Sequence, residues 1–81
     1  MNSEAVVLTL YHRYGCHLCE EMLERLQELA TVLDFRVDIV DVDADLDLKT
    51  EYNERVPVLA LGDRQIAQYF LDEDVLKNHL A

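Results

Sequence analysis

The chain has 81 residues, of which 51% are hydrophobic and 30% are charged, and its formal net charge at pH 7 is −10. This length suits a single domain, residues 1–81, and the composition is too apolar for a disordered chain. The acidity excludes a surface that attracts nucleic acid or an anionic membrane, because both carry negative charge. We therefore expect a folded monomer whose partners are other proteins, with a preference for basic surfaces.

The opening residues show no basic segment followed by an apolar stretch and a small-residue cleavage pattern. The longest apolar run, residues 5–10, is interrupted by Thr9 and is far too short to cross a bilayer. These two observations predict a cytoplasmic protein. In that reducing compartment, two close cysteines are expected to do transient chemistry or bind metal, because permanent disulfides are rare there.

Residues 5–13 (AVVLTLYHR) predict a strand, and their nearly continuous apolar character is typical of a strand covered on both faces. Gly15 turns the chain, and from Cys16 onward apolar residues recur at helical spacing. These residues are Leu18, Met22, Leu26, Leu29 and Leu33. The pattern predicts a helix of about four turns, supported by a Glu21 and Arg25 pair at i, i+4.

Residues 35–43 (FRVDIVDVD) alternate between apolar and polar side chains. This alternation predicts a strand with one solvated face, at the edge of a sheet. Residues 44–53 are less regular and predict a short helix, with Asp45 as its N-cap.

Residues 56–61 (VPVLAL) predict another apolar strand. Residues 62–64 (GDR) predict a hairpin turn, after which residues 65–70 return antiparallel to the preceding strand. Residues 72–80 predict a closing helix that is capped by Asp72.

The predicted order of elements is therefore β-α-β-α-β-β-α. The first strand-helix-strand unit places its two strands parallel, and the hairpin adds two more strands. The result is a four-stranded mixed sheet flanked by three helices that cover both of its faces. Because a C-x-x-C motif falls at the turn between the first strand and the first helix, we predict an α/β protein with a thioredoxin-like fold.

Cys16 and Cys19 are the only cysteines, with His17 and Leu18 between them. Cys16 begins the predicted helix, where free backbone N–H groups and the helix dipole stabilise a thiolate, the reactive form of cysteine. Cys19 lies one turn deeper on the same face, and two cysteines so placed can close a disulfide. Cys16 is then the exposed attacking thiol and Cys19 the more buried thiol that resolves a mixed disulfide.

Other interpretations of the pair stay open. Cysteines also pack as small apolar residues, and C-x-x-C is a common half of a zinc site. A structural zinc needs four ligands, and the only further histidines are His12, His17 and His79, so we expect no protein-bound metal. An iron–sulfur cluster shared between two chains would take one thiolate, from Cys16, of each chain.

Two aromatic residues and a histidine flank the pair. His17 either tunes the thiol through its charge or is a solvated residue of the first helical turn. Tyr11 and Tyr14 either line a substrate groove or cover the end of the first strand. Pro57 begins a strand in a central position, where proline is disfavoured, so it is either a strand-start proline or part of a cis bond with Val56 that faces the cysteines.

Three features together resemble the glutaredoxins: GCHLC at the first helix, RVPVL at the third strand, and the order of the elements. More narrowly, they resemble the small bacterial glutaredoxin-like proteins with a C-x-L-C motif, over nearly the whole chain. The resemblance implies a thiol–disulfide oxidoreductase that transfers electrons through a redox-active centre. It makes Cys16 the nucleophile and Cys19 the resolving cysteine.

The resemblance also implies three substrate-binding residues. Arg13 matches a basic residue that in glutaredoxins helps to hold the glycine carboxylate of glutathione. Val56 matches the residue whose backbone pairs with the backbone of the substrate cysteine. Pro57 matches the cis-proline that follows it.

The chain also departs from the glutaredoxin pattern. Cys-His-Leu-Cys replaces the usual Cys-Pro-Tyr-Cys, and Tyr69 and Phe70 stand where glutaredoxins carry a Gly-Gly pair that lets glutathione approach. The negative charge also disfavours anionic glutathione. We therefore expect a protein disulfide or a reductase as partner, no resident cofactor, and glutathione at most as a cosubstrate. The alternatives are a non-catalytic binding module with an acidic surface, and metal or iron–sulfur binding through Cys16.

Overall fold

The computed structural model describes residues 6–80. Four strands and three helices follow one another in this order: β1 (Val6–His12), α1 (His17–Leu29), β2 (Phe35–Asp41), α2 (Leu46–Tyr52), β3 (Val58–Leu61), β4 (Arg64–Gln68) and α3 (Glu73–Leu80). Short 3-10 helices, η1 (Val42–Ala44) and η2 (Asn53–Arg55), flank α2. The predicted order β-α-β-α-β-β-α is confirmed. Within residues 6–80, no helix is long and apolar enough to cross a membrane.

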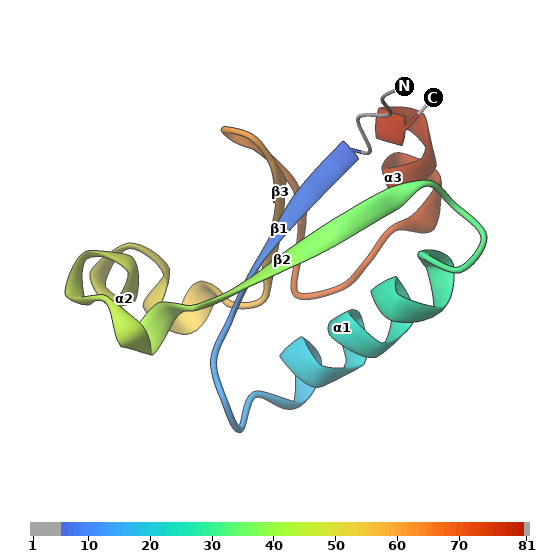
Figure 1. The fold of residues 1–81 in the computed structure, drawn as a ribbon. Coiled ribbons are helices and arrows are strands. Elements are labelled where there is room, and N and C mark those ends of the chain that lie inside the picture. Colours follow the sequence, from blue (N-terminus) through green and yellow to red (C-terminus); the bar gives the residue numbers. More distant parts are fainter. Residues whose placement is uncertain (1–5, 81) are drawn as a thin grey trace.

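The strands form one mixed sheet in the order β2-β1-β3-β4 (Figure 1). β1 runs parallel to β2 and antiparallel to β3, and β3 pairs antiparallel with β4. The prediction of an edge strand at residues 35–43 is confirmed, because β2 is an outer strand. Tyr11 near the end of β1 lies opposite Val58 at the start of β3. This register brings the turn after β1 to the same end of the sheet as the segment before β3.

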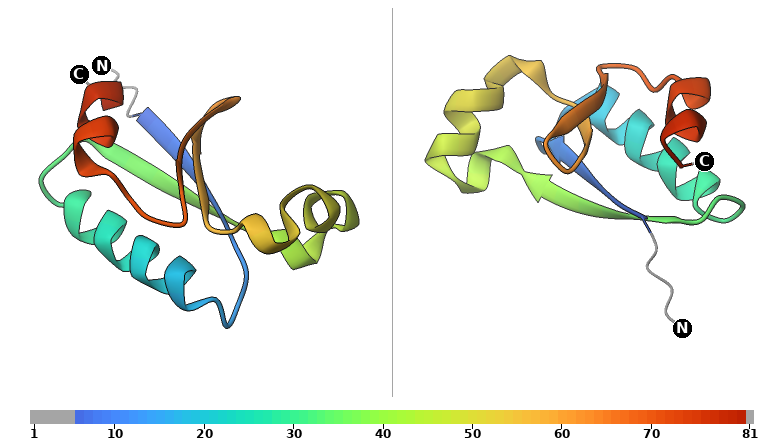
Figure 2. Two further views of the ribbon diagram at one scale, coloured as in Figure 1. Left: turned by 180° about the vertical axis from the view of Figure 1, so that it is seen from behind. Right: turned by 90° about the horizontal axis from the view of Figure 1, so that it is seen from above.

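The core lies on one face of the sheet. Leu8 and Leu10 alternate along β1, and Leu10 pairs with Leu59 of β3, while α1 and α3 cover this face (Figures 1 and 2). The buried cluster consists of Leu8, Leu10, Met22, Leu26, Leu29, Phe35, Leu59 and Leu76. The leucines at helical spacing in α1 therefore face the sheet, as their periodicity predicts.

The other face of the sheet is covered only at one end. Val7 remains 36% exposed, so the prediction that both faces of this strand are covered is wrong at this residue, whereas Thr9 and Tyr11 on the same face are partly buried. α2 has 7 residues, a length of about 10 Å, which is too short to span the sheet. It lies beyond the end of the strands (Figure 1) and meets the second face where Tyr52 stacks on Tyr11, with 4.3 Å between ring centroids.

α1 ends earlier than the apolar spacing predicts. The helix closes at Leu29, and the hydroxyl of Thr31 donates a hydrogen bond to the carbonyl of Glu28 at 2.7 Å. Thr31 and Val32 are β-branched, which makes them poor helix residues, and their backbone N–H groups bond only three residues back. Leu33 still packs against the core, but from the loop.

Other predicted boundaries also shift by a few residues. β2 stops at Asp41 because its carboxylate accepts the N–H of Asp43 at 2.9 Å and starts η1. β4 stops before Tyr69, whose φ of 67° cannot continue a strand. The predicted helix caps at Asp45 and Asp72 are confirmed, since each carboxylate accepts two backbone N–H groups of the following turn. Of the first predicted strand, residue 5 lies outside the described residues.

The predicted pair between Glu21 and Arg25 is wrong. Arg25 instead donates to both carboxylate oxygens of Glu73 on α3, at 2.6 and 3.1 Å, and to Glu28 at 2.8 Å. A planar guanidinium favours this two-pronged contact with one carboxylate over a single contact within the helix. Glu21 pairs with His17 at 2.6 Å. Hydrogen bonding to Arg25 lowers the pKa of the Glu73 carboxyl below its usual range.

Candidate active site

The two cysteines lie where β1 turns into α1. Gly15, with a φ of 82°, allows the turn, and the N–H of Cys16 closes it by donating to the carbonyl of Arg13 at 3.2 Å. Cys16 is the N-cap of α1, and its Sγ accepts the backbone N–H of Cys19 at 3.1 Å. The Sγ atoms of the two cysteines lie at disulfide distance, with their Cα atoms 5.1 Å apart.

The two sulfurs differ in exposure. Cys19 is only 2% exposed, whereas Cys16 is partly exposed, so the prediction that Cys19 is the deeper of the two is confirmed. Cys19 is buried with Val42 of η1 and with Val56. Partly buried residues of β1, of α2 and of the turn before α1 pack against this group. We call the whole set the cysteine cluster: Cys19, Val42, Val56, Tyr11, Cys16, Leu48 and Tyr52. Only one of the two sulfurs is therefore presented to a partner.

The segment before β3 meets the cysteines. The Val56–Pro57 peptide bond is cis, Val56 belongs to the cysteine cluster, and Pro57 is fully buried. The carbonyl of Pro57 accepts the N–H of Tyr69 at 2.9 Å. Among residues 6–80, no group donates a hydrogen bond to the carbonyl of Val56. Of the predicted substrate-binding residues, Val56 is the one that belongs to the cysteine cluster.

Arg13 is directed to an acidic partner. Its Nε lies 3.0 Å from the Oδ2 of Asp43 in η1, so its positive charge is matched by a carboxylate of the same chain. The sequence did not indicate this pair, because residues 35–43 were predicted to be one continuous strand. This ion pair with Asp43 weakens the attraction of Arg13 for a carboxylate of a ligand.

His17 and Tyr14 lie outside the cysteine cluster. The His17 ring is on the exposed surface of α1, with its Nε2 2.6 Å from the Oε2 of Glu21. Tyr14 is 79% exposed and packs edge-on against the ring of His12, with 5.2 Å between centroids. Tyr11, in contrast, belongs to the cluster through its stacking on Tyr52. Burial is the main cause that raises the pKa of the Tyr52 phenol, and the neighbouring Tyr11 raises this pKa further.

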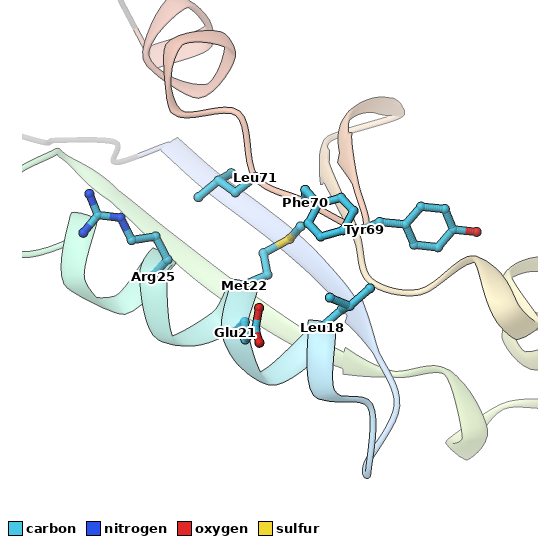
Figure 3. Close-up of a pocket in the computed structure, with 7 residues that line it drawn as sticks. All are labelled: Leu18, Glu21, Met22, Arg25, Tyr69, Phe70 and Leu71. Carbon is cyan, nitrogen blue, oxygen red and sulfur yellow. The ribbon is translucent and has the colours of Figure 1, made fainter.

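A groove of about 210 Å³ lies beside the pair (Figure 3). Its α1 wall is formed by Leu18, Glu21, Met22 and Arg25, and its other wall by Tyr69, Phe70 and Leu71, which follow β4. We call it the Phe70 groove. Sequence reasoning assigned Leu18 and Met22 to the helical core and missed the groove, although their spacing of four residues already placed them on one face of the helix.

Within residues 6–80, the structure has no group of three or more His, Cys, Asp and Glu side chains that could hold a metal ion. The candidate site consists of the cysteine pair, the Val56–Pro57 segment and the Phe70 groove. Its chemistry is that of two thiols that can form and open a disulfide.

Comparison with known proteins identifies the family. Residues 7–81 match the model of the glutaredoxin-like domain (DUF836). The fold is similar to that of protein Ne2328 from Nitrosomonas europaea, with a TM-score of 0.83 and 38% identity over 100% of this chain and 98% of that one. It is also similar to protein XcR50 from X. campestris, with a TM-score of 0.66 and 36% identity over 90% of this chain and 93% of that one.

A mutant thioredoxin from Halobacterium salinarum gives a TM-score of 0.63 and 29% identity, over 91% of this chain and 70% of that one. The predicted α/β thioredoxin-like fold is therefore confirmed. The chain belongs to the glutaredoxin-like (DUF836) family of the thioredoxin superfamily.

Proposed function

We propose that the protein is a thiol–disulfide oxidoreductase of the cytoplasm that acts on protein disulfides through Cys16 and Cys19. One observation carries the proposal: the two sulfurs lie at disulfide distance at the start of α1, and only Cys16 is accessible. The start of a helix favours a thiolate, and a partly exposed thiolate beside a buried partner is the arrangement that thiol exchange requires.

The reaction begins from the reduced protein. The Cys16 thiolate attacks one sulfur of the substrate disulfide, and the other substrate sulfur leaves as a thiolate. The thiolate of Cys19 then attacks the Sγ of Cys16, which releases the second substrate sulfur and closes the Cys16–Cys19 disulfide. Two electrons pass from the protein to the substrate, and a reductase or a thiol donor returns the protein to its reduced form.

The backbone around Val56 supports the positioning of the substrate. Val56 lies in the cysteine cluster, and no group within residues 6–80 donates a hydrogen bond to its carbonyl, so this carbonyl is available to an N–H of an extended substrate segment. Such a contact would hold the substrate disulfide beside Cys16. This role agrees with the one that the family resemblance implies for the residue before the proline.

Three observations favour protein disulfides over glutathione. Arg13, the residue expected to hold the glycine carboxylate of glutathione, is paired with Asp43. Tyr69 and Phe70 place two large side chains at the groove beside the pair. The net charge of −10 repels an anionic tripeptide and attracts a protein with a basic surface.

The test is an intact-mass measurement after equilibration in a series of glutathione redox buffers, with free thiols trapped by alkylation. We expect the protein to pass between two free thiols and one internal disulfide. A Cys16→Ser variant should lose turnover of a protein disulfide, and a Cys19→Ser variant should accumulate the mixed disulfide on Cys16.

Other outcomes would contradict the proposal in different ways. Two thiols that stay free and unreactive throughout would favour a non-catalytic binding module. A stable glutathione adduct on Cys16 would point to a working glutathione site in place of a protein substrate. Visible absorbance that is lost in Cys16→Ser would favour an iron–sulfur cluster.

A further inference from the structure

The Phe70 groove begins at the redox pair. Leu18 lies between the two cysteines in the first turn of α1, and Met22 follows it one turn later on the same wall (Figure 3). The cysteines do not line the groove, which adjoins the proposed reaction site through Leu18.

The opposite wall holds a large aromatic side chain in solvent. Phe70 is 71% exposed, and the segment that carries it is fixed on both sides. The N–H of Tyr69 donates to Pro57, the Tyr69 hydroxyl donates to the carbonyl of Glu54 at 3.4 Å, and the N–H of Phe70 donates to Gln68 at 2.7 Å. The neighbouring Tyr69 is also 39% exposed, and contiguous exposed apolar side chains are typical of a contact surface for a partner.

The backbone of this wall is unusual. Tyr69 has a φ of 67°, a left-handed conformation that is sterically strained for a residue with a Cβ. The surrounding structure holds the residue there against that strain, which is a feature associated with binding sites. The conformation directs Phe70 toward the groove and away from the path of β4.

The groove also has a definite size and charge. Its volume of about 210 Å³ is below the roughly 300 Å³ at which pockets begin to bury a small-molecule ligand, so it suits a single side chain. The charge of Arg25 is taken up by Glu73 and Glu28, and the remaining acidic group at the rim is Glu21, whose Oε2 lies 2.6 Å from the Nε2 of the exposed His17 ring. The rim of the groove at Glu21 therefore favours the binding of a positively charged group.

We infer that the Phe70 groove receives a large apolar side chain that neighbours the reactive cysteine of a protein substrate, with a basic residue of the same substrate segment facing Glu21. This inference rests on the proposed function and specifies its substrate class. The occupant is an extended peptide segment, because Val56 in the cysteine cluster offers backbone contact and the groove that adjoins Leu18 offers an apolar pocket.

The first experiment compares two peptides, Lys-Phe-Cys-Phe-Lys and Lys-Ser-Cys-Ser-Lys, each supplied as its disulfide-linked homodimer. One reduced protein and one dimer give one oxidised protein and two peptide thiols, which chromatography quantifies after an acid quench. We expect the phenylalanine peptide to react about tenfold faster, the effect of burying part of one aromatic side chain. Equal rates for the two dimers would overturn the inference and leave the proposed function intact, whereas no reaction with either would overturn the proposed function.

A matched pair of variants assigns the preference to the groove. Phe70→Ser should reduce the preference to about twofold or less, because it removes the exposed wall. Val32→Ser changes an apolar residue of similar exposure, 76%, far from the groove, and should leave the preference unchanged. A preference that survives in Phe70→Ser would contradict the inference. Because Phe70 is largely exposed, the variant is expected to fold.

The expected preference for a basic residue facing Glu21 is tested with the peptide Glu-Phe-Cys-Phe-Glu. The wild-type protein should react faster with the lysine peptide than with this one. Glu21→Gln should reduce that preference by at least about twofold more than Glu24→Gln, which removes the same charge from α1 outside the groove. Equal effects of the two variants would assign the charge preference to the acidic surface as a whole and contradict a role of Glu21.

Discussion

The guanidinium of Arg25 and the carboxylate of Glu73 form two hydrogen bonds, at 2.6 and 3.1 Å, that join α1 to the first turn of α3. The hydrogen bonding lowers the pKa of Glu73. A carboxyl group whose pKa is lower in the folded state stabilises the fold at pH values above its unfolded pKa. This stabilisation is lost as the pH falls through the folded pKa.

Glu73→Gln should therefore lower the free energy of unfolding at pH 7, and the difference from wild type should shrink at pH values below the ordinary glutamate pKa of about 4.3. Urea unfolding between pH 7 and pH 3 measures both quantities. Glu24→Gln removes the same charge from a glutamate that has no ion pair within residues 6–80, and serves as the control. Equal stabilities of Glu73→Gln and wild type at pH 7 would show that the pair does not hold α3.

Asp43→Asn should make the protein more reactive toward oxidised glutathione. The substitution frees the guanidinium of Arg13, which then attracts a carboxylate of the ligand. We expect the rate to rise by about twofold to fivefold, the scale of one exposed charge pair. Folding stability should change by less than about 1 kcal/mol, because both side chains are partly exposed.

The control for this variant is Asp63→Asn, which removes the same charge at the β3–β4 turn, at the opposite end of β3 from the cysteine cluster. Stopped-flow kinetics with oxidised glutathione compares the two. If both variants raise the rate equally, the effect is due to net charge and the pairing of Arg13 with Asp43 has no part in it.

Two substitutions of Cys16 should separate stability from reactivity. In the reduced protein, Cys16→Ser keeps an acceptor for the N–H of Cys19, whereas Cys16→Ala leaves that helix-start donor without its N-cap. The alanine variant should therefore be about 1 kcal/mol less stable than the serine variant in urea unfolding under reducing conditions. Both should lack turnover. Identical unfolding curves for the two variants would contradict the N-cap role of Cys16.

Tyr69 should tolerate glycine better than alanine. At a φ of 67° any Cβ is strained, so Tyr69→Gly should be more stable than Tyr69→Ala by about 1 kcal/mol. At most other backbone positions alanine is the more stable of the two. The same pair at Phe70 is the control, and there alanine should be at least as stable as glycine. An alanine variant more stable than glycine at Tyr69 would refute the strained conformation.

Much of the fold could be predicted because its signals are local. The helical spacing of Leu18, Met22 and Leu26 and the apolar run before Gly15 reflect which face of each element is buried. The caps at Asp45 and Asp72 depend on atoms within one helical turn. The cysteine pair was found for the same reason, because both thiols lie in one turn of the sequence.

The rest of the site depends on contacts between distant segments. Arg25 pairs with a glutamate 48 residues away, and Arg13 pairs with Asp43 across 30 residues. The Phe70 groove exists because α1 and the segment after β4 are brought together by the sheet and the core. Sequence spacing offers several charged partners for each arginine, and only the packed fold decides among them.

The coverage of the sheet was overestimated for a related reason. A run of apolar residues indicates burial but does not reveal what supplies the cover. Val7 and Leu8 are both apolar, yet only Leu8 is buried, because α1 and α3 pack on its side. The length of α2 determines how much of the second face is shielded, and that length depends on the turn that Asp41 starts after β2.

The cysteine cluster and the main core share no residue. Substitutions around the cysteines, at Val42 or Val56, therefore leave the main core intact, while substitutions at Leu26 or Leu59 act on that core. The Phe70 groove differs, because Met22 lines it and also belongs to the main core. A lineage can therefore change the surroundings of its cysteines without disturbing its main core, and an engineered library at the cysteine cluster can do the same.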